Sequence, residues 1–316
     1  MNLKKLLKFL SFFSFFSVAA FVAVLVYTTI IFNDNLEEIN SQINNTISIN
    51  NNFLNISEIP EIEEYKNNEK REIPTHILED FMKQFPHIAV YYSNIYNDFT
   101  FTHNPNRVYF AASLTKAPYA MYIFQKADNG EINLSEEHPF LREYFAGGSG
   151  IIQDKYSFGH MFSQRQLLGY NIYFSDNIAL RMLRSIHGLD GFIEFVQSLG
   201  INGDNVHNIT YSRTTAVDSG ILTRAMYDYI NSNEQHSKEF LNHLLNNHYG
   251  FIRSDYPIAS KTGWFDGFGG AWHEMAIVYA PSPYILVLLS NNYGGEDTEI
   301  FNKIADFIEE FNRNNF

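Results

Sequence analysis

The hydrophobic pattern begins with an uninterrupted apolar run near the N-terminus. Residues 9–32 are 24 consecutive positions without a charged side chain. As a helix this run would extend about 36 Å, and the hydrocarbon core of a bilayer is about 30 Å thick. Lys4, Lys5 and Lys8 precede the run, and such a basic flank stays in the cytoplasm. We expect residues 1–8 to be a short cytoplasmic N-terminus and residues 9–32 to be a transmembrane signal anchor, single-pass in the cell membrane, with the rest of the chain extracytoplasmic.

The alternative for this run is a cleaved signal peptide. Its hydrophobic region has about 7–15 residues and ends in an A-x-A-like site. The run is longer, and Ala19, Ala20 and Ala23 form no clean site of that kind. The pattern therefore favours an uncleaved anchor.

Residues 33–72 lose the apolar pattern and become rich in Asn, Glu, Ile and Ser, with nine acidic and three basic side chains. Leu36, Ile39 and Ile43 have helical spacing, but the repeat stops before three heptads accumulate, which disfavours a coiled coil. Such a composition is typical of a solvated tether. We expect an extracytoplasmic stalk here and one folded domain over residues 73–316.

Within the domain the hydrophobic period changes from strand-like to helical and back. After a short helix over residues 75–85, two strands are expected, over residues 87–93 and 98–103. Helical patterns follow over residues 112–128, 163–186, 188–199, 219–231 and 238–247. Strand patterns return over residues 258–263, 271–280 and 284–291, before a helix over residues 297–311. This order predicts an α/β (α+β) fold, with a sheet made from both ends of the domain, an inserted all-helical lobe, and a cleft between them.

The amino-acid composition excludes several classes of function. Asp and Glu outnumber Lys and Arg by 35 to 22, which argues against binding to nucleic acid. The absence of cysteine excludes disulfides, thiol nucleophiles and Cys-ligated metals. His273-Glu274 is similar to the start of a zinc motif, but Ile277 stands where the second histidine would be. We expect no metal site and no cofactor.

Three short motifs occur in order: Ser113-Leu114-Thr115-Lys116, Ser175-Asp176-Asn177 and Lys261-Thr262-Gly263. A serine and a lysine three apart at a helix start lie on one face, about one turn apart. Burial or a second cation lowers the pKa of the amine, which can then take the serine proton. A single S-x-x-K is expected by chance roughly once in a chain of this length. All three motifs in this order are expected in fewer than about one unrelated chain in a hundred.

The set resembles the serine penicillin-recognising enzymes, specifically the class A β-lactamase-like branch, whose motifs are S-x-x-K, S-D-N and K-T-G. Residues 110–118 (FAASLTKAP), 147–153 (GGSGIIQ) and 258–263 (IASKTG) are also similar to that family. The resemblance covers residues 75–312. It implies a β-lactamase/D,D-peptidase-like two-lobe fold, with an antiparallel sheet flanked by helices and the helical lobe inserted.

The resemblance implies catalytic roles for four residues. Ser113 would be the nucleophile that forms an acyl-enzyme, and Lys116 its activating amine. Ser175 would relay a proton to the leaving nitrogen. Lys261 would hold the substrate carboxylate and supply the second cation that keeps Lys116 neutral. For Asp176, in the second motif, a carboxylate that caps or braces its loop is favoured over a direct role in proton transfer.

The resemblance also implies four substrate-binding residues. Asn177 would hydrogen-bond the side-chain amide of the substrate, and Thr262 would bind its carboxylate. The backbone N–H groups of Ser113 and Trp264 would form the oxyanion hole. Gly263 would leave room for a substrate that lies along the edge strand.

One family feature is missing. Class A β-lactamases carry a glutamate, in an E-x-x-L-N context between S-D-N and K-T-G, which activates the water for deacylation. Residues 199–224 contain no glutamate, and their only acids are Asp204 and Asp218. We expect Asp218 to cap the next helix. The resemblance therefore implies acylation with slow deacylation of lactams.

These inferences predict a membrane-anchored extracytoplasmic serine hydrolase that acts on β-lactams or on the D-Ala-D-Ala cell-wall peptides that they mimic. Two enzyme activities remain open, that of a β-lactamase and that of a D,D-peptidase or transpeptidase. A third alternative is a penicillin-binding sensor or cell-envelope scaffold without hydrolysis.

Overall fold

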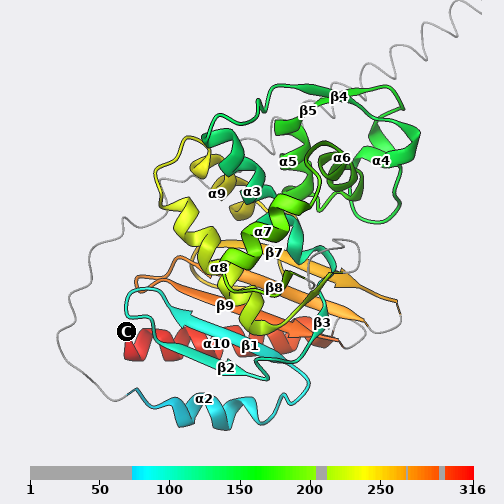
Figure 1. Ribbon diagram of the computed structural model, residues 1–316. Helices are drawn as coiled ribbons and strands as arrows, with labels where there is room; N and C mark the ends of the chain where they lie inside the picture. The colour runs from blue at the N-terminus through cyan, green and yellow to red at the C-terminus, as the bar shows by residue number, and fades with distance from the viewer. Residues whose placement is uncertain (1–72, 204–211, 268–269, 292–295) are drawn as a thin grey trace, which may run out of the picture. The chain divides into compact units, whose positions relative to one another are not determined.

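The computed structural model describes residues 73–203, 212–267, 270–291 and 296–316 (Figure 1). The predicted cytoplasmic N-terminus, membrane anchor and stalk lie outside the described residues, and so does Asp204. In the described part of the chain, no helix combines the length and the apolarity needed to cross a bilayer.

An antiparallel five-stranded sheet forms the centre of the domain, with strand order β2-β1-β9-β8-β7. Its strands are β1 (Ala89–Asn94), β2 (Thr100–His103), β7 (Ile258–Phe265), β8 (Ala271–Val278) and β9 (Tyr284–Ser290). β1 precedes the helical segment and β9 follows it, so their pairing joins both ends of the domain into one sheet. The predicted order of sheet, helices and sheet is confirmed.

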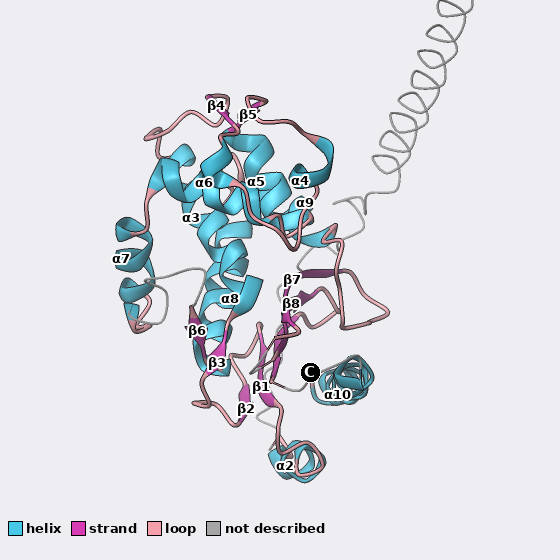
Figure 2. Ribbon diagram, turned by 90° about the vertical axis from the view of Figure 1, so that its right-hand side faces the viewer, coloured by secondary structure: helices cyan, strands magenta, loops and turns pink. Residues whose placement is uncertain are grey.

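Helices cover both faces of this sheet (Figures 1 and 2). α2 (Thr75–Met82) and α10 (Glu296–Asn315) pack on one face, around a core that includes Leu286 and Ile304. α8 (Ala216–Ile230) packs against β1, β8 and β9 on the other face. Every residue of the central strand β9 is therefore buried, as expected of a strand covered on both sides.

The helical lobe lies beyond α8, on the side of the sheet opposite α10 (Figure 2). Its helices are α3 (Lys116–Asp128), α4 (Ile152–Lys155), α5 (Gln164–Tyr173), α6 (Asn177–His187), α7 (Asp190–Ser198) and α9 (Ser237–Leu245). Two short 3-10 turns are η2 (Ala112–Thr115) and η3 (Arg142–Tyr144). Two antiparallel strand pairs were not predicted: β3 (Tyr109–Phe110) with β6 (Arg213–Thr214), and β4 (Glu137–Pro139) with β5 (Met161–Ser163). Strands of two or three residues are too short to show a hydrophobic period.

The single helix predicted over residues 163–186 is wrong, because the chain breaks between α5 and α6. Ser175 adopts a left-handed conformation with φ of 52°, which no regular helix accommodates. Asp176 then starts α6 as its N-cap, since its side chain accepts the backbone N–H groups of Ile178 and Ala179. Both helices bury apolar residues toward the same lobe core, so the helical period continues across the break.

The expected cap of the helix after residue 215 is also different. Thr215 is the N-cap of α8, and its hydroxyl accepts the backbone N–H of Asp218. Asp218 therefore lies in the first turn of the helix instead of capping it. A carboxylate in this position interacts favourably with the helix dipole.

Candidate active site

Ser113 lies in η2, between β3 and α3, on a turn held against the end of the sheet. Ala111 donates its backbone N–H to the carbonyl of Ser212 (2.8 Å). Ala112 has a φ of 48°, an uncommon conformation for a residue with a Cβ, and such strain is concentrated at functional sites. The Ser113 side chain is partly exposed and makes no hydrogen bond to another described residue. Its hydroxyl is therefore available to a ligand.

Lys116 begins α3 and is 2% exposed. Its Nζ donates to Asn177 Oδ1 (2.8 Å), to the carbonyl oxygen of Ser175, and to Ser175 Oγ (3.3 Å). Burial lowers the pKa of the Lys116 amine to about 7, although the charge of Asp176 opposes this shift. A considerable fraction of the amine is therefore neutral near pH 7, which a proton acceptor requires.

Lys261 reaches the same serine from the sheet. Its Nζ donates to Ser175 Oγ (3.1 Å) and to the carbonyl of Thr262 (2.8 Å), and its side chain is fully buried. Burial lowers the pKa of Lys261 well below its ordinary value, and the neighbouring charge of Lys116 lowers it further. The Ser175 hydroxyl thus lies between two buried amines, an arrangement suited to passing a proton.

Glu274 on β8 supplies a negative charge near Lys261 and opposes the lowering of its pKa. The Glu274 carboxylate is fully buried and accepts the N–H groups of Phe251 and Ile252 (2.7 Å each) and the hydroxyl of Ser260 (2.6 Å). Burial raises the pKa of this carboxyl to about 7. The sequence did not indicate this role, because it arises from the pairing of β7 with β8.

Asn177 ties the loop between α5 and α6 to the turn that enters the lobe. In addition to accepting from Lys116, its side chain donates to the carbonyl of Gly147 (3.0 Å), and its backbone N–H donates to Ser149 (3.0 Å). The structure thus brings together Lys116, Ser175, Asn177 and Lys261. The contact of Asn177 with a substrate amide stays a prediction.

Gly263 brings β7 against the turn that carries Ser113. A Cβ at this position would lie 2.8 Å from the carbonyl oxygen of Ala111 and 3.1 Å from the backbone nitrogen of Ser113. Both contacts are with backbone, which cannot move aside as a side chain can. Close packing against the turn is therefore one reason for glycine here, and the room for a substrate along the strand stays a prediction.

Thr262 and Trp264 flank this glycine on the edge strand of the sheet. Thr262 Oγ1 is buried and has no hydrogen-bond partner in the described part of the chain. A buried hydroxyl without a partner is unfavourable, and a bound carboxylate would satisfy it. Trp264 exposes 40% of its surface and follows Gly263 on the same edge strand.

Two further buried residues support the site without having been predicted. Asn171 donates from Nδ2 to the carbonyl of Lys116 (3.0 Å). His273 accepts the N–H of Ser290 at Nδ1, so Nε2 carries the proton and donates to the carbonyl of Phe110 (2.9 Å). Burial lowers the pKa of His273 to about 4, which keeps the ring neutral. Neither residue belongs to one of the three motifs, and the sequence singled out His273 only as part of an incomplete zinc motif.

Asp176 braces the site, as expected. Its carboxylate is buried and accepts four backbone N–H groups, from Ile151 (2.8 Å), Ile152 (2.9 Å), Ile178 (2.8 Å) and Ala179 (3.0 Å). It thereby joins the entry turn of the lobe to α6.

We expect Asp176→Ala to lower the free energy of unfolding by roughly 3–5 kcal/mol, because it leaves four N–H groups, three of them in buried hydrogen bonds, without their acceptor. Urea unfolding of the soluble domain measures this change. Asp190, an exposed acid in the first turn of α7, provides the matched control, and Asp190→Ala should cost less than about 1 kcal/mol. Equal effects of the two substitutions would contradict the bracing role.

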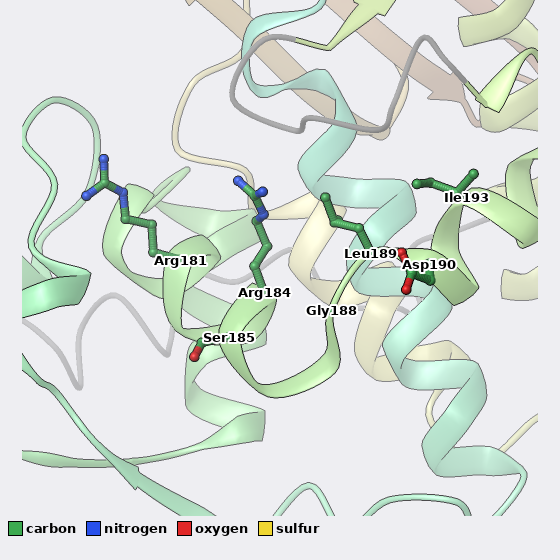
Figure 3. Close-up of a pocket in the computed structure, with 7 residues that line it drawn as sticks. All are labelled: Arg181, Arg184, Ser185, Gly188, Leu189, Asp190 and Ile193. Atoms are coloured by element: carbon green, nitrogen blue, oxygen red, sulfur yellow. The ribbon is translucent and has the colours of Figure 1, made fainter.

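Other described parts of the lobe offer different surfaces. A cavity of about 470 Å³ lies between α6 and α7 and includes Arg181, Arg184 and Asp190 (Figure 3). Arg181 donates to the carbonyl of Phe145 (2.6 Å) there. None of the motif residues lines this cavity. The described residues contain no cluster of three or more His, Asp or Glu side chains that could hold a metal ion.

Solved structures show the same fold. A β-lactamase from Chitinophaga pinensis is 18% identical, with a TM-score of 0.64 over 76% of this chain and 99% of that chain. TLA-3 extended-spectrum β-lactamase is 19% identical, with a TM-score of 0.64 over 75% and 97%. A point mutant of PBP-A is 18% identical, with a TM-score of 0.63 over 75% and 94%. At such identities the likeness establishes the fold, including its antiparallel sheet and helical lobe.

The family comparison covers more than the motifs. Among curated proteins, none matches this sequence. Residues 74–311, however, match the model of the beta-lactamase enzyme family. This range is nearly the whole folded domain. The fold, the order of the motifs and this match agree, and the protein belongs to the beta-lactamase enzyme family as a serine hydrolase of the class A β-lactamase-like type.

Proposed function

We propose that the protein forms an acyl-enzyme through Ser113 with β-lactams or with D-Ala-D-Ala peptides. The Ser113 oxygen attacks the carbonyl carbon while Lys116 takes the hydroxyl proton. The C–N bond then breaks, and the leaving nitrogen receives a proton from Ser175, which regains one from Lys116. The N–H groups of Ser113 and Trp264 stabilise the oxyanion.

The observation that carries this proposal is the position of the Ser175 hydroxyl. It lies 3.3 Å from Lys116 Nζ and 3.1 Å from Lys261 Nζ, so a continuous path for the proton leads from one motif to the next. The PBP-A mutant that is similar in fold is described as an acyl-enzyme complex with penicillin G. That description supports penicillin as a ligand for the present chain.

The choice between lactam and peptide turns on deacylation. No glutamate occurs between residues 199 and 224, so the carboxylate that activates water in class A β-lactamases has no counterpart in that segment. This favours a D,D-peptidase or transpeptidase over a rapid β-lactamase.

The discriminating experiment gives the soluble domain penicillins and acyl-D-Ala-D-Ala peptides in parallel, and follows hydrolysis together with intact mass. Release of D-alanine over many turnovers supports the peptidase. Rapid lactam hydrolysis would establish a β-lactamase. A single stoichiometric adduct without release of D-alanine would instead favour a penicillin-binding sensor or scaffold.

We also propose that residues 9–32 anchor the protein in the cell membrane, with the enzyme domain outside. The support is the uncharged run and the three lysines that precede it. Protease added outside intact cells should release the domain and leave a small membrane fragment. A domain that stays protected until the cells are lysed would refute this topology.

A further inference from the structure

An exposed aromatic ring lies beside the turn that carries Ser113. Phe265, the last residue of β7, exposes 46% of its surface. Its ring packs edge-on against that of Phe110, with 5.6 Å between centroids and 78° between planes. Phe110 ends β3, three residues before Ser113. A Cβ at Gly267 would lie 2.1 Å from Phe265 Cζ, so the glycine leaves the space that the ring occupies.

The position of Phe265 along β7 relates it to the site. Side chains alternate between the two faces of a strand, so Lys261, Gly263 and Phe265 point to the same face. Gly263 abuts the turn of Ser113, and Lys261 reaches Ser175. At about 3.3 Å per residue, Phe265 lies about 7 Å beyond Gly263, and Lys261 about 7 Å before it. The nucleophile turn therefore stands between a polar end of the strand, at Lys261, and an apolar end, at Phe265.

The chemistry of acyl transfer orients the substrate between these ends. The leaving nitrogen takes its proton from Ser175, which is hydrogen-bonded to Lys261, so the leaving group lies at the Lys261 end of the strand. Thr262, with its unpartnered hydroxyl, lies at the same end. The acyl half of the substrate then extends from Ser113 in the opposite direction, toward Phe265.

We propose that Phe265 and Phe110 form an aromatic platform that binds the acyl side chain of the substrate and selects aromatic or other uncharged apolar groups. This inference rests on the acylation of Ser113 and names the part of the substrate that the proposed function leaves open. Aromatic rings favour offset or edge-to-face contact with another ring, which a half-exposed Phe265 offers. Arg213 pairs with Phe110 in the β3–β6 ladder, so a carboxylated side chain is the competing ligand.

The test compares acylation rates for three penicillins that share the same ring system and side-chain amide. Their side chains are benzyl, methyl and α-carboxybenzyl. The native domain should react at least about tenfold faster with the benzyl compound than with the methyl compound, as an apolar subsite provides. Phe265→Ala should reduce this ratio to about threefold or less, mainly by slowing the benzyl compound. Gly267→Ala, which displaces the ring without removing it, should reduce the ratio in the same direction.

Phe158 provides the matched control. It is 47% exposed and packs against Phe140 in the helical lobe. Phe158→Ala should leave the ratio unchanged. An unchanged ratio in Phe265→Ala, with acylation intact, overturns the platform alone, and so does a preference for the α-carboxybenzyl compound, which would point to Arg213. If the native domain is acylated by none of the three compounds, the proposed function itself fails and this inference fails with it.

Discussion

Ser113→Ala is expected to abolish covalent labelling of the protein by a fluorescent penicillin. The adduct is an ester to the serine oxygen, so removal of that oxygen removes the bond itself instead of slowing its formation. The Ser113 hydroxyl makes no hydrogen bond to another described residue, and its backbone N–H is unaffected by the substitution. The fold should therefore be retained, and a thermal unfolding curve close to that of the native domain would show this.

The control for this experiment is Ser157→Ala, which removes an exposed hydroxyl in the helical lobe. It should be labelled as completely as the native protein, with the signal read by gel fluorescence and by intact mass. Persistent stoichiometric labelling of Ser113→Ala would show that another residue is acylated. The assignment of the nucleophile, and with it the proton path through Ser175, would then have to be abandoned.

The motif residues could be predicted because each motif consists of three or four neighbouring residues. Ser113 and Lys116 are three residues apart at the start of a helix, and the structure places them in η2 and at the first residue of α3. The strand-rich C-terminal end of the domain was also visible, since β7, β8 and β9 each have seven or eight residues. Local spacing and a long period are the two signals that a single sequence carries well.

The supporting contacts were not predictable, because they depend on tertiary register. Glu274 accepts hydrogen bonds from β7 and from residues 251 and 252, which lie more than twenty positions away. His273 holds a carbonyl 163 positions distant. The sequence next to Glu274 and His273 does not indicate which groups they bind. Sequence reasoning therefore found the groups proposed to act on the substrate, and missed those that hold them in place.

The break between α5 and α6 could not be predicted from the spacing of apolar residues. The apolar spacing continues through residues 163–186, yet Ser175 is in a left-handed conformation and Asp176 binds four N–H groups. The strained serine is the one whose hydroxyl touches both lysines. Strain at this residue is stabilised by the Asp176 network, in keeping with the general concentration of strained residues at active sites.

The second large effect concerns the lifetime of the acyl-enzyme. With excess benzylpenicillin, we expect the protein to gain the mass of one intact ligand and to keep it for minutes or longer. Acylation uses groups that are all present, namely Ser113, Lys116 and Ser175. Hydrolysis of the ester requires in addition a water aligned on the carbonyl and a base to deprotonate it. General base assistance contributes roughly 10² to 10⁴ in rate, so deacylation without it should be slower by about that factor.

Pre-steady-state kinetics provide the decisive measurement. Loss of the lactam ring absorbance should show a burst of one equivalent followed by a slow phase, and once excess ligand is removed the adduct mass should decay at the rate of that slow phase. Steady hydrolysis at many turnovers per second with no detectable adduct would mean that a base is present after all. Asp218→Asn then identifies it: a return of the burst in this variant would assign the base to Asp218, which lies in the first turn of α8, whereas unchanged turnover would leave Asp204 as the other acid of residues 199–224.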